Sequence, residues 1–288
     1  MSPASLVTEH LATAVGKVSL TRGGAAGGPP LVYLHSSGGE AGDTSAAPFL
    51  EAVGDRFEVF APMLPGFAGS EGLDQIDDIE DAAYHCIDVF ERLGLTGART
   101  PHVVGLSLGG WVAAEIAWRA PTSLASVTLV SAVGIYVPGH PMAELFGRRF
   151  NELAEMTFAD QSHPVAAMMN HLASVSIADS SAVPFDVIRP FFESMAAAAK
   201  LGWNPYFHNP KLPRRLGRVK APTLVLCGRL DGLVPNAVAE EYSRLVPGAR
   251  LEAWDDASHM IPLEQPDRLA ALVAEHALGA EPGISRRR

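Results

Sequence analysis

The sequence predicts an α/β protein built on a mostly parallel, doubly wound sheet, because apolar strand patterns and helical patterns take turns along the chain. Strands that helices cover on both faces form continuous apolar runs rich in valine and leucine, whereas half-exposed strands alternate. Seven such runs are predicted as strands, at residues 15–21, 31–35, 57–63, 102–106, 127–131, 223–228 and 250–254. Helices are predicted between them, at residues 79–93, 109–120, 237–245 and 266–277.

One long segment breaks this alternation. Residues 134–212 contain no convincing strand, but they carry helical patterns over 142–156, 164–174 and 184–200. A strand precedes the segment and another follows it, so we interpret it as an insertion between neighbouring strands of one sheet. The predicted organisation is therefore a first core part at 1–133, a helical segment at 134–212, and a second core part at 213–288.

Composition narrows the range of functions. The chain has 288 residues, 48% of them hydrophobic, and a formal net charge of −10, which suits a sizeable core and disfavours nucleic acid as a partner. Its two cysteines lie outside any metal-binding pattern, and no apolar stretch reaches the ~18–20 residues of a membrane span. We expect no cofactor, no metal and no membrane span, a hydrophobic small-molecule substrate, and a cytoplasmic location. A homo-oligomer is compatible with the sequence.

The central motif is GLSLG at residues 105–109. It follows a predicted strand and opens a predicted helix, so Ser107 lies at a sharp strand-to-helix turn where flanking glycines avoid clashes. Such a turn lifts the hydroxyl above the edge of the sheet, where the amino terminus of the helix favours developing negative charge. The pattern predicts that Ser107 is a nucleophile.

A serine hydroxyl needs a base, and the base needs a carboxylate that orients it. Asp231 follows the strand 223–228, and His259 follows the strand 250–254. Because these residues and Ser107 come after the carboxyl ends of strands, we expect them to meet at one edge of the sheet. Their order along the chain, Ser–Asp–His, fits this interpretation. Asp255 and Asp256 are weaker candidates for the acid, since they precede His259 on its own loop.

The oxyanion of an acyl-transfer reaction needs backbone N–H donors. We expect one donor at Leu108, directly after the nucleophile. The second is expected at Ser37, in the small-residue loop that follows the strand 31–35. His35 and Ser36 in the same region are predicted to contact the substrate.

These motifs resemble the α/β-hydrolase fold superfamily, in its capped serine hydrolase branches. The resemblance runs from Leu31 to about Leu278 and rests on the His35 loop, LPGFAGS at 64–70, GLSLGG at 105–110, PTLVLCGRLD at 222–231 and SHMIPLEQP at 258–266. It implies that residues 134–212 form a helical cap that carries substrate selectivity. The sequence departs from the family pattern where His35-Ser36 replaces the usual His-Gly pair and where Met63 replaces the aspartate often found before Leu-Pro-Gly.

The leading functional interpretation is a serine hydrolase that cleaves a carboxylic ester or lactone of a hydrophobic small molecule through an acyl-enzyme. The alternatives are a hydrolase that cleaves a C–C bond in a vinylogous diketone produced by ring cleavage, and a non-catalytic small-molecule receptor. Met260 follows His259 where C–C hydrolases typically have tryptophan, which weakens that alternative. Residues predicted for the substrate pocket are Phe146, Met168 and Trp203, from a wider apolar set with Phe150, Met156, Met169, Phe191, Phe192 and Met195.

Overall fold

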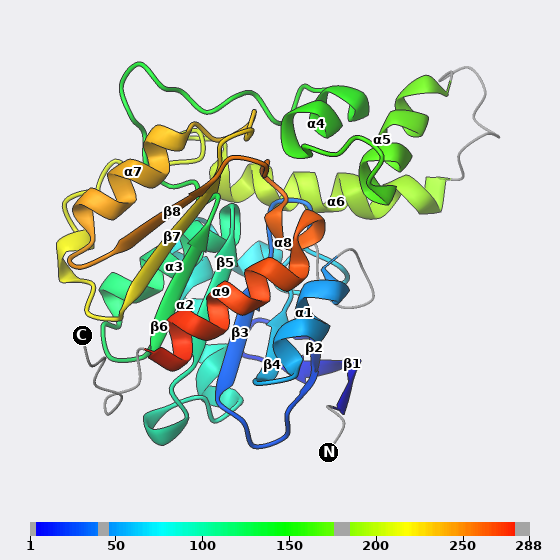
Figure 1. Ribbon diagram of the computed structural model, residues 1–288. Helices are drawn as coiled ribbons and strands as arrows, with labels where there is room; N and C mark the ends of the chain where they lie inside the picture. The colour runs from blue at the N-terminus through cyan, green and yellow to red at the C-terminus, as the bar shows by residue number, and fades with distance from the viewer. Residues whose placement is uncertain (1–3, 40–45, 176–184, 280–288) are drawn as a thin grey trace.

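Eight strands form one sheet in the computed structural model, which describes residues 4–39, 46–175 and 185–279 (Figure 1). The strand order is β1-β2-β4-β3-β5-β6-β7-β8. The pairs β1/β2 and β2/β4 are antiparallel, and every other pair is parallel, which confirms the predicted sheet. The strands are β1 (Ala4–Ala12), β2 (Lys17–Gly24), β3 (Pro30–Leu34), β4 (Glu58–Pro62), β5 (His102–Leu106), β6 (Ser126–Val130), β7 (Thr223–Gly228) and β8 (Arg250–Trp254).

Helices cover both faces of this sheet. In Figure 1, α1 and α9 lie on one face, and α2 and α3 lie on the other. Every residue of β3, β5 and β6 is consequently buried, which explains why these strands show continuous apolar runs. The core helices are α1 (Ala47–Gly54), α2 (Ile79–Arg92), α3 (Leu108–Arg119), α7 (Asn236–Leu245), α8 (Ile261–Glu264) and α9 (Pro266–Gly279), with 3-10 turns η1 (Leu73–Gln75), η2 (Gly97–Arg99) and η3 (Leu216–Arg218).

The first strand was not predicted from the sequence. β1 pairs with β2 along one edge of the sheet, and most of its side chains are exposed or half-buried. An edge strand in solvent carries no continuous apolar run, so the pattern that identifies the buried strands is missing here.

Between β6 and β7, the described residues form three α-helices and the 3-10 turn η3, and no named strand. These helices are α4 (Phe150–Thr157), α5 (Pro164–Ser174) and α6 (Phe185–Gly202). Figure 1 shows them together above the edge where the parallel strands end. The helix predicted for 142–156 was wrong in its first half, because α4 begins only at Phe150. Just before that start, the Arg149 N–H donates a 2.8 Å hydrogen bond to the Glu152 carboxylate.

The two ends of this segment are fastened to each other and to the core. Gly134 N–H donates to the Phe207 carbonyl at 2.9 Å, and Asn209 N–H donates to the Gly134 carbonyl at 3.0 Å. The Asn209 side chain also donates to the Glu115 carboxylate of α3 at 2.8 Å. Glu115 is fully buried and pairs with Arg119, so the chain leaves and rejoins the sheet at one well-packed place.

None of the helices in the described part of the chain combines the length and the apolar character that a bilayer-spanning helix needs.

Candidate active site

Ser107 occupies a sharp turn between β5 and α3. Its backbone φ is 54° and its ψ is −110°, a sparsely populated conformation for a residue with a side chain. The glycines around it have no room for a Cβ: one at Gly109 would lie 2.6 Å from the His35 carbonyl oxygen, and one at Gly110 would lie 2.6 Å from the Ala132 Cβ. Since Ser107 N–H donates to the Val130 carbonyl at 2.9 Å, strand β6 helps to hold the strained turn.

Asp231 and His259 lie on the loops after β7 and β8, and their side chains meet. The Nδ1–H of His259 donates to Oδ2 of Asp231 at 2.8 Å, with both side chains almost completely buried. The other carboxylate oxygen, Oδ1, accepts hydrogen bonds from the N–H groups of Leu233 and Val234 at 2.9 and 2.8 Å. Three donors therefore fix the carboxylate, which in turn orients the imidazole.

The carboxyl end of helix α4 holds the histidine loop. The Thr157 carbonyl accepts hydrogen bonds from the N–H groups of His259 and Met260 at 3.1 and 3.0 Å. One residue earlier, the Met156 carbonyl accepts from Gly232 N–H at 2.9 Å. The last carbonyls of a helix lack partners inside it, so here they bind the two loops that carry Asp231 and His259.

The loop after β3 lies on another side of the site. His35 is fully buried, where Nε2 accepts from Leu64 N–H at 3.0 Å and Nδ1–H donates to the Ser36 carbonyl at 2.7 Å. The Ser36 hydroxyl accepts from Gly38 N–H at 3.0 Å, so His35 and Ser36 together shape the path of the loop through Ser37. Leu108 is the first residue of α3, and its N–H has no acceptor within the helix.

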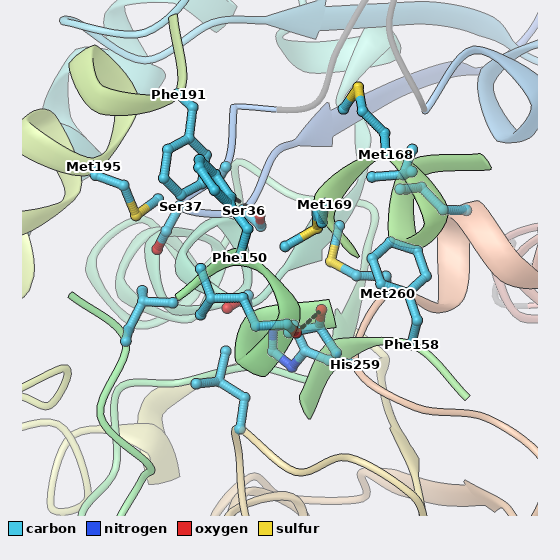
Figure 2. A pocket seen from close by; sticks show the side chains of 18 of the residues that line it. Ser36, Ser37, Phe150, Phe158, Met168, Met169, Phe191, Met195, His259 and Met260 are labelled. Atoms are coloured by element: carbon cyan, nitrogen blue, oxygen red, sulfur yellow. Dashed lines mark hydrogen bonds between the residues drawn. The ribbon is translucent and has the colours of Figure 1, made fainter. Parts of the chain in front are cut away.

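A cavity of about 210 Å³ connects these parts (Figure 2). It brings Ser107, His259, Ser36 and Ser37 to one space, and no Asp, Glu, Lys or Arg is among its described lining residues. Apolar side chains make up most of the wall: Leu145, Phe150, Leu153, Phe158, Val165, Met168, Met169, Leu172, Ile188, Phe191, Met195, Leu233, Met260 and Leu263. Gly38 and Thr157 complete it. The cavity can hold a neutral, apolar molecule beside Ser107 and His259.

Three residues predicted to bind substrate do not line this cavity. His35 is buried behind the loop that it shapes. Phe146 packs against Phe207 and Trp203, with ring centroids 5.4 and 5.6 Å apart, because its backbone lies before α4 rather than on the helix predicted there. Trp203 lies just beyond the end of α6 with 60% of its surface exposed. Among the predicted pocket residues, Met168 does line the cavity.

Neither cysteine offers a rival nucleophile. Cys227 lies in β7 near Asp231, and burial, with a contribution from the Asp231 carboxylate, raises its pKa to about 11. Burial likewise raises the pKa of Cys86 to about 12. The reactive form of a cysteine is the thiolate, so both side chains remain inert thiols at neutral pH.

Residues 29–266 match the family model described as alpha/beta hydrolase fold. The chain belongs to that family. It is 27% identical over 260 residues to the dihydrolipoyllysine-residue acetyltransferase component of an acetoin cleaving system from Cupriavidus necator, covering 88% of this chain and 64% of that protein. It is 26% identical over 267 residues to the carboxylesterase YbfK of Bacillus subtilis, covering 90% of this chain and 83% of the relative.

Another relative of this hydrolase-fold chain is the 2-hydroxy-6-oxo-6-phenylhexa-2,4-dienoate hydrolase of Burkholderia cepacia, 25% identical over 260 residues, with 86% of this chain and 87% of the relative covered. Among solved structures, a membrane phospholipase A described as a bacterial virulence factor matches with a TM-score of 0.79 at 21% identity, covering 96% of this chain and 87% of that one. The corresponding dienoate hydrolase from Rhodococcus sp. strain RHA1 matches with a TM-score of 0.76 at 24% identity, covering 95% and 99%. These structural likenesses confirm the α/β-hydrolase fold.

The sequence did not point to two residues that hold the candidate site together through hydrogen bonds with backbone groups. Nothing in the sequence singles out Thr157, because its carbonyl rather than its side chain holds the histidine loop. Glu264 was also missed: its Oε1 accepts from the N–H groups of Ala159 and Asp160 at 2.8 and 2.9 Å, which ties the segment after α4 to α8. A glutamate five residues after a predicted catalytic histidine is the only signal that could have drawn attention to it.

Proposed function

We propose that this chain is a serine hydrolase that cleaves a carboxylic ester or lactone of a hydrophobic small molecule through an acyl-enzyme. One observation carries the proposal: Ser107, at a strained turn, and His259, fixed by Asp231 at 2.8 Å, border the same apolar cavity. A nucleophile, a base and an orienting carboxylate are the groups that acyl transfer by serine requires.

The geometry supports a two-stage reaction. Because the Nδ1–H of His259 donates to Asp231, its Nε2 is free to accept the Ser107 proton while Oγ forms a bond to the substrate carbonyl carbon. The N–H groups of Leu108 and Ser37 stabilise the oxyanion. His259 returns the proton to the leaving oxygen as the C–O bond breaks. Water then attacks the acyl-enzyme, gives a proton to His259, and releases the acid as Ser107 regains its proton.

We also propose that residues 134–212 are a cap that selects the substrate, and that 1–133 and 213–288 form the core beneath it. Twelve of the twenty described lining residues of the cavity come from this segment, and ten of the twelve lie on α4, α5 or α6. All twelve are uncharged. The wall thus favours neutral, apolar acyl or alcohol groups over sugars and charged metabolites.

The C–C hydrolase alternative has a relative in the Burkholderia cepacia dienoate hydrolase, whose named substrate carries a carboxylate. Burying a carboxylate without a paired cation is costly. The described wall of this cavity holds no Lys or Arg, and Arg189, next to the lining residue Ile188, is half exposed and pairs with Glu193 at 3.2 Å. Because the described wall has no cation that could pair with a substrate carboxylate, an uncharged ester or lactone fits the cavity better.

The test combines labelling with turnover. A fluorophosphonate probe should label wild-type protein and leave Ser107→Ala unlabelled. A panel of p-nitrophenyl esters of graded length, aliphatic lactones and one ring-cleavage diketone should then show turnover of esters or lactones but not of the diketone. Selective turnover of the diketone would establish C–C hydrolysis instead. Absence of both labelling and turnover in folded protein would favour the non-catalytic small-molecule receptor.

A further inference from the structure

The wall of the cavity divides into two apolar sides. Figure 2 shows Met168 and Met169 of α5 on one side of the view, together with Phe158 and Met260. We call these four residues the α5 side. Opposite them lie Phe191 and Met195 of α6, beside the loop that carries Ser36 and Ser37. With Phe150, whose ring centroid is 4.9 Å from that of Phe191, they form what we call the α6 side.

The α5 side borders the catalytic base. Met260 follows His259 directly, and the carbonyl of Thr157 binds both of their N–H groups, at 3.1 and 3.0 Å. Phe158 is the next residue after Thr157, and its side chain lies on the same side of the view in Figure 2 as Met260. A leaving alcohol must lie within hydrogen-bond reach of the imidazole that protonates it. The space next to the base is therefore where the alcohol half of an ester would lie.

The α6 side borders the loop of Ser36 and Ser37, which holds the carbonyl oxygen in the proposed mechanism. Once the leaving oxygen faces His259, the acyl substituent must take the other direction from the carbonyl carbon. That direction is lined by Phe150, Phe191 and Met195. The three side chains are apolar, as are the four of the α5 side.

We infer, resting on the proposed function, that the substrate is an acyclic ester in which the alcohol half is apolar as well as the acyl half. The alcohol half binds on the α5 side and the acyl half binds on the α6 side. Burial of apolar surface on both halves then contributes to binding, while a charged or strongly hydrated alcohol would lose its solvation without gaining a partner. The α5 side sets alcohol selectivity, and the α6 side sets acyl selectivity.

The experiment varies the two halves of the ester separately. One series keeps a butanoyl group and changes the alcohol from methanol to butanol and hexanol, and the other keeps butanol and lengthens the acid from butanoic to octanoic. Acid release, followed with a pH indicator, gives kcat/KM for each ester. Wild type should prefer butyl over methyl butanoate by at least tenfold, since methylenes in an apolar pocket discriminate strongly.

Two variants then assign the sides. Met169→Ala should change the rate ratios across the alcohol series by about tenfold and leave the acyl series within twofold. Phe191→Ala should do the reverse. Phe192→Ala controls for the loss of a phenyl ring from α6, because Phe192 is 52% exposed and does not line the cavity, while its ring centroid lies 5.7 Å from that of Phe191. Met142→Ala is the methionine control, because Met142 lines a separate cavity and not this one. Melting temperatures show whether each variant is folded under the assay conditions.

Four outcomes would overturn the inference. If the wild type cleaves methyl and butyl butanoate equally well, it has no apolar site for the alcohol. Variants that exchange their effects would reverse the assignment of the two sides, and variants that each change both series would show one undivided pocket. A preference for lactones over every acyclic ester would refute the substrate class. If no ester or lactone is cleaved and Ser107 is not labelled, the proposed function itself fails, which is a different result from lost selectivity in an active esterase.

Discussion

Replacing Asp231 by asparagine changes a single atom yet should move the proton on His259 from one ring nitrogen to the other. Oδ1 accepts hydrogen bonds from the N–H groups of Leu233 and Val234 at 2.9 and 2.8 Å, so the amide oxygen of asparagine must take this place. The amide NH₂ then replaces Oδ2, which lies 2.8 Å from Nδ1 of His259. Because this NH₂ can only donate, Nδ1 becomes the acceptor and the proton moves to Nε2.

An imidazole protonated at Nε2 cannot accept the proton of Ser107. The corresponding change in a serine protease lowers kcat by roughly 10⁴-fold, and we expect a loss of the same order here, or about 5.5 kcal/mol in the barrier. The fold should survive, since both backbone donors keep an acceptor. Initial rates with p-nitrophenyl butanoate, normalised to folded protein, measure the effect.

Asp256→Asn supplies the matched control. Asp256 is exposed and pairs with Arg268 at 2.8 Å, away from the imidazole, so its variant should stay within about twofold of wild type. Asp255 pairs with Arg229 at 2.7 Å and should behave in the same way. If Asp231→Asn keeps more than a tenth of wild-type activity, or if either neighbouring variant loses more, the orienting carboxylate has been assigned wrongly.

Three further predictions concern other parts of the molecule. Ser107→Ala should abolish ester turnover, by several orders of magnitude in kcat, without lowering the melting temperature by more than a few degrees. Phe146→Ala should cost about 2–4 kcal/mol in urea unfolding and leave the acyl-chain profile unchanged, because Phe146 packs against Phe207 and Trp203 outside the cavity. Burial is the main cause that lowers the pKa of His102 from 6.5 to about 4, and the nearby His276 lowers it further. Acid should therefore destabilise the fold.

Acid destabilises the fold because the unfolded chain binds a proton on His102 at a higher pH than the folded protein does. Between pH 6.5 and 4, His102 binds a proton in the unfolded chain but not in the folded protein. The contribution of His102 to the unfolding free energy is therefore intact above pH 6.5 and is lost as the pH falls toward 4. The full loss of unfolding free energy from this residue is about 3 kcal/mol. In His102→Gln the unfolding free energy should depend less steeply on pH across this range, and an unchanged slope would contradict the assignment. For Phe146, altered chain-length selectivity at unchanged stability would be the opposing result.

The fold could be predicted because its signals are local. The fully buried strands β3, β5 and β6 read as continuous apolar runs, and the glycines around Ser107 mark the turn that follows β5. The edge strand β1 lacks such a run and was missed. Candidate residues such as Asp231 and His259 could be named because each follows the carboxyl end of a parallel strand, and the topology brings those ends together.

The lining of the cavity could not be predicted in the same way. Phe191 and Phe192 are adjacent and chemically identical, yet one lines the cavity and the other is 52% exposed. Which of them faces inward depends on how α6 is rotated against the core, and apolar content alone does not reveal that rotation. Phe146 was misplaced because the helix predicted around it starts later, after Gly147.

The loops of His259 and Asp231 donate hydrogen bonds to the last carbonyls of α4, and this limits which parts of the insertion could be exchanged to change substrate selectivity. The segment that forms most of the cavity wall also supports His259, the proposed base, through the carbonyls of Met156 and Thr157. Exchanging that segment for one from another hydrolase would therefore disturb proton transfer along with selectivity. Chimeras that keep residues 150–160 and replace only α5 and α6 should retain catalysis. New specificities are thus more accessible through those two helices than through replacement of the whole insertion.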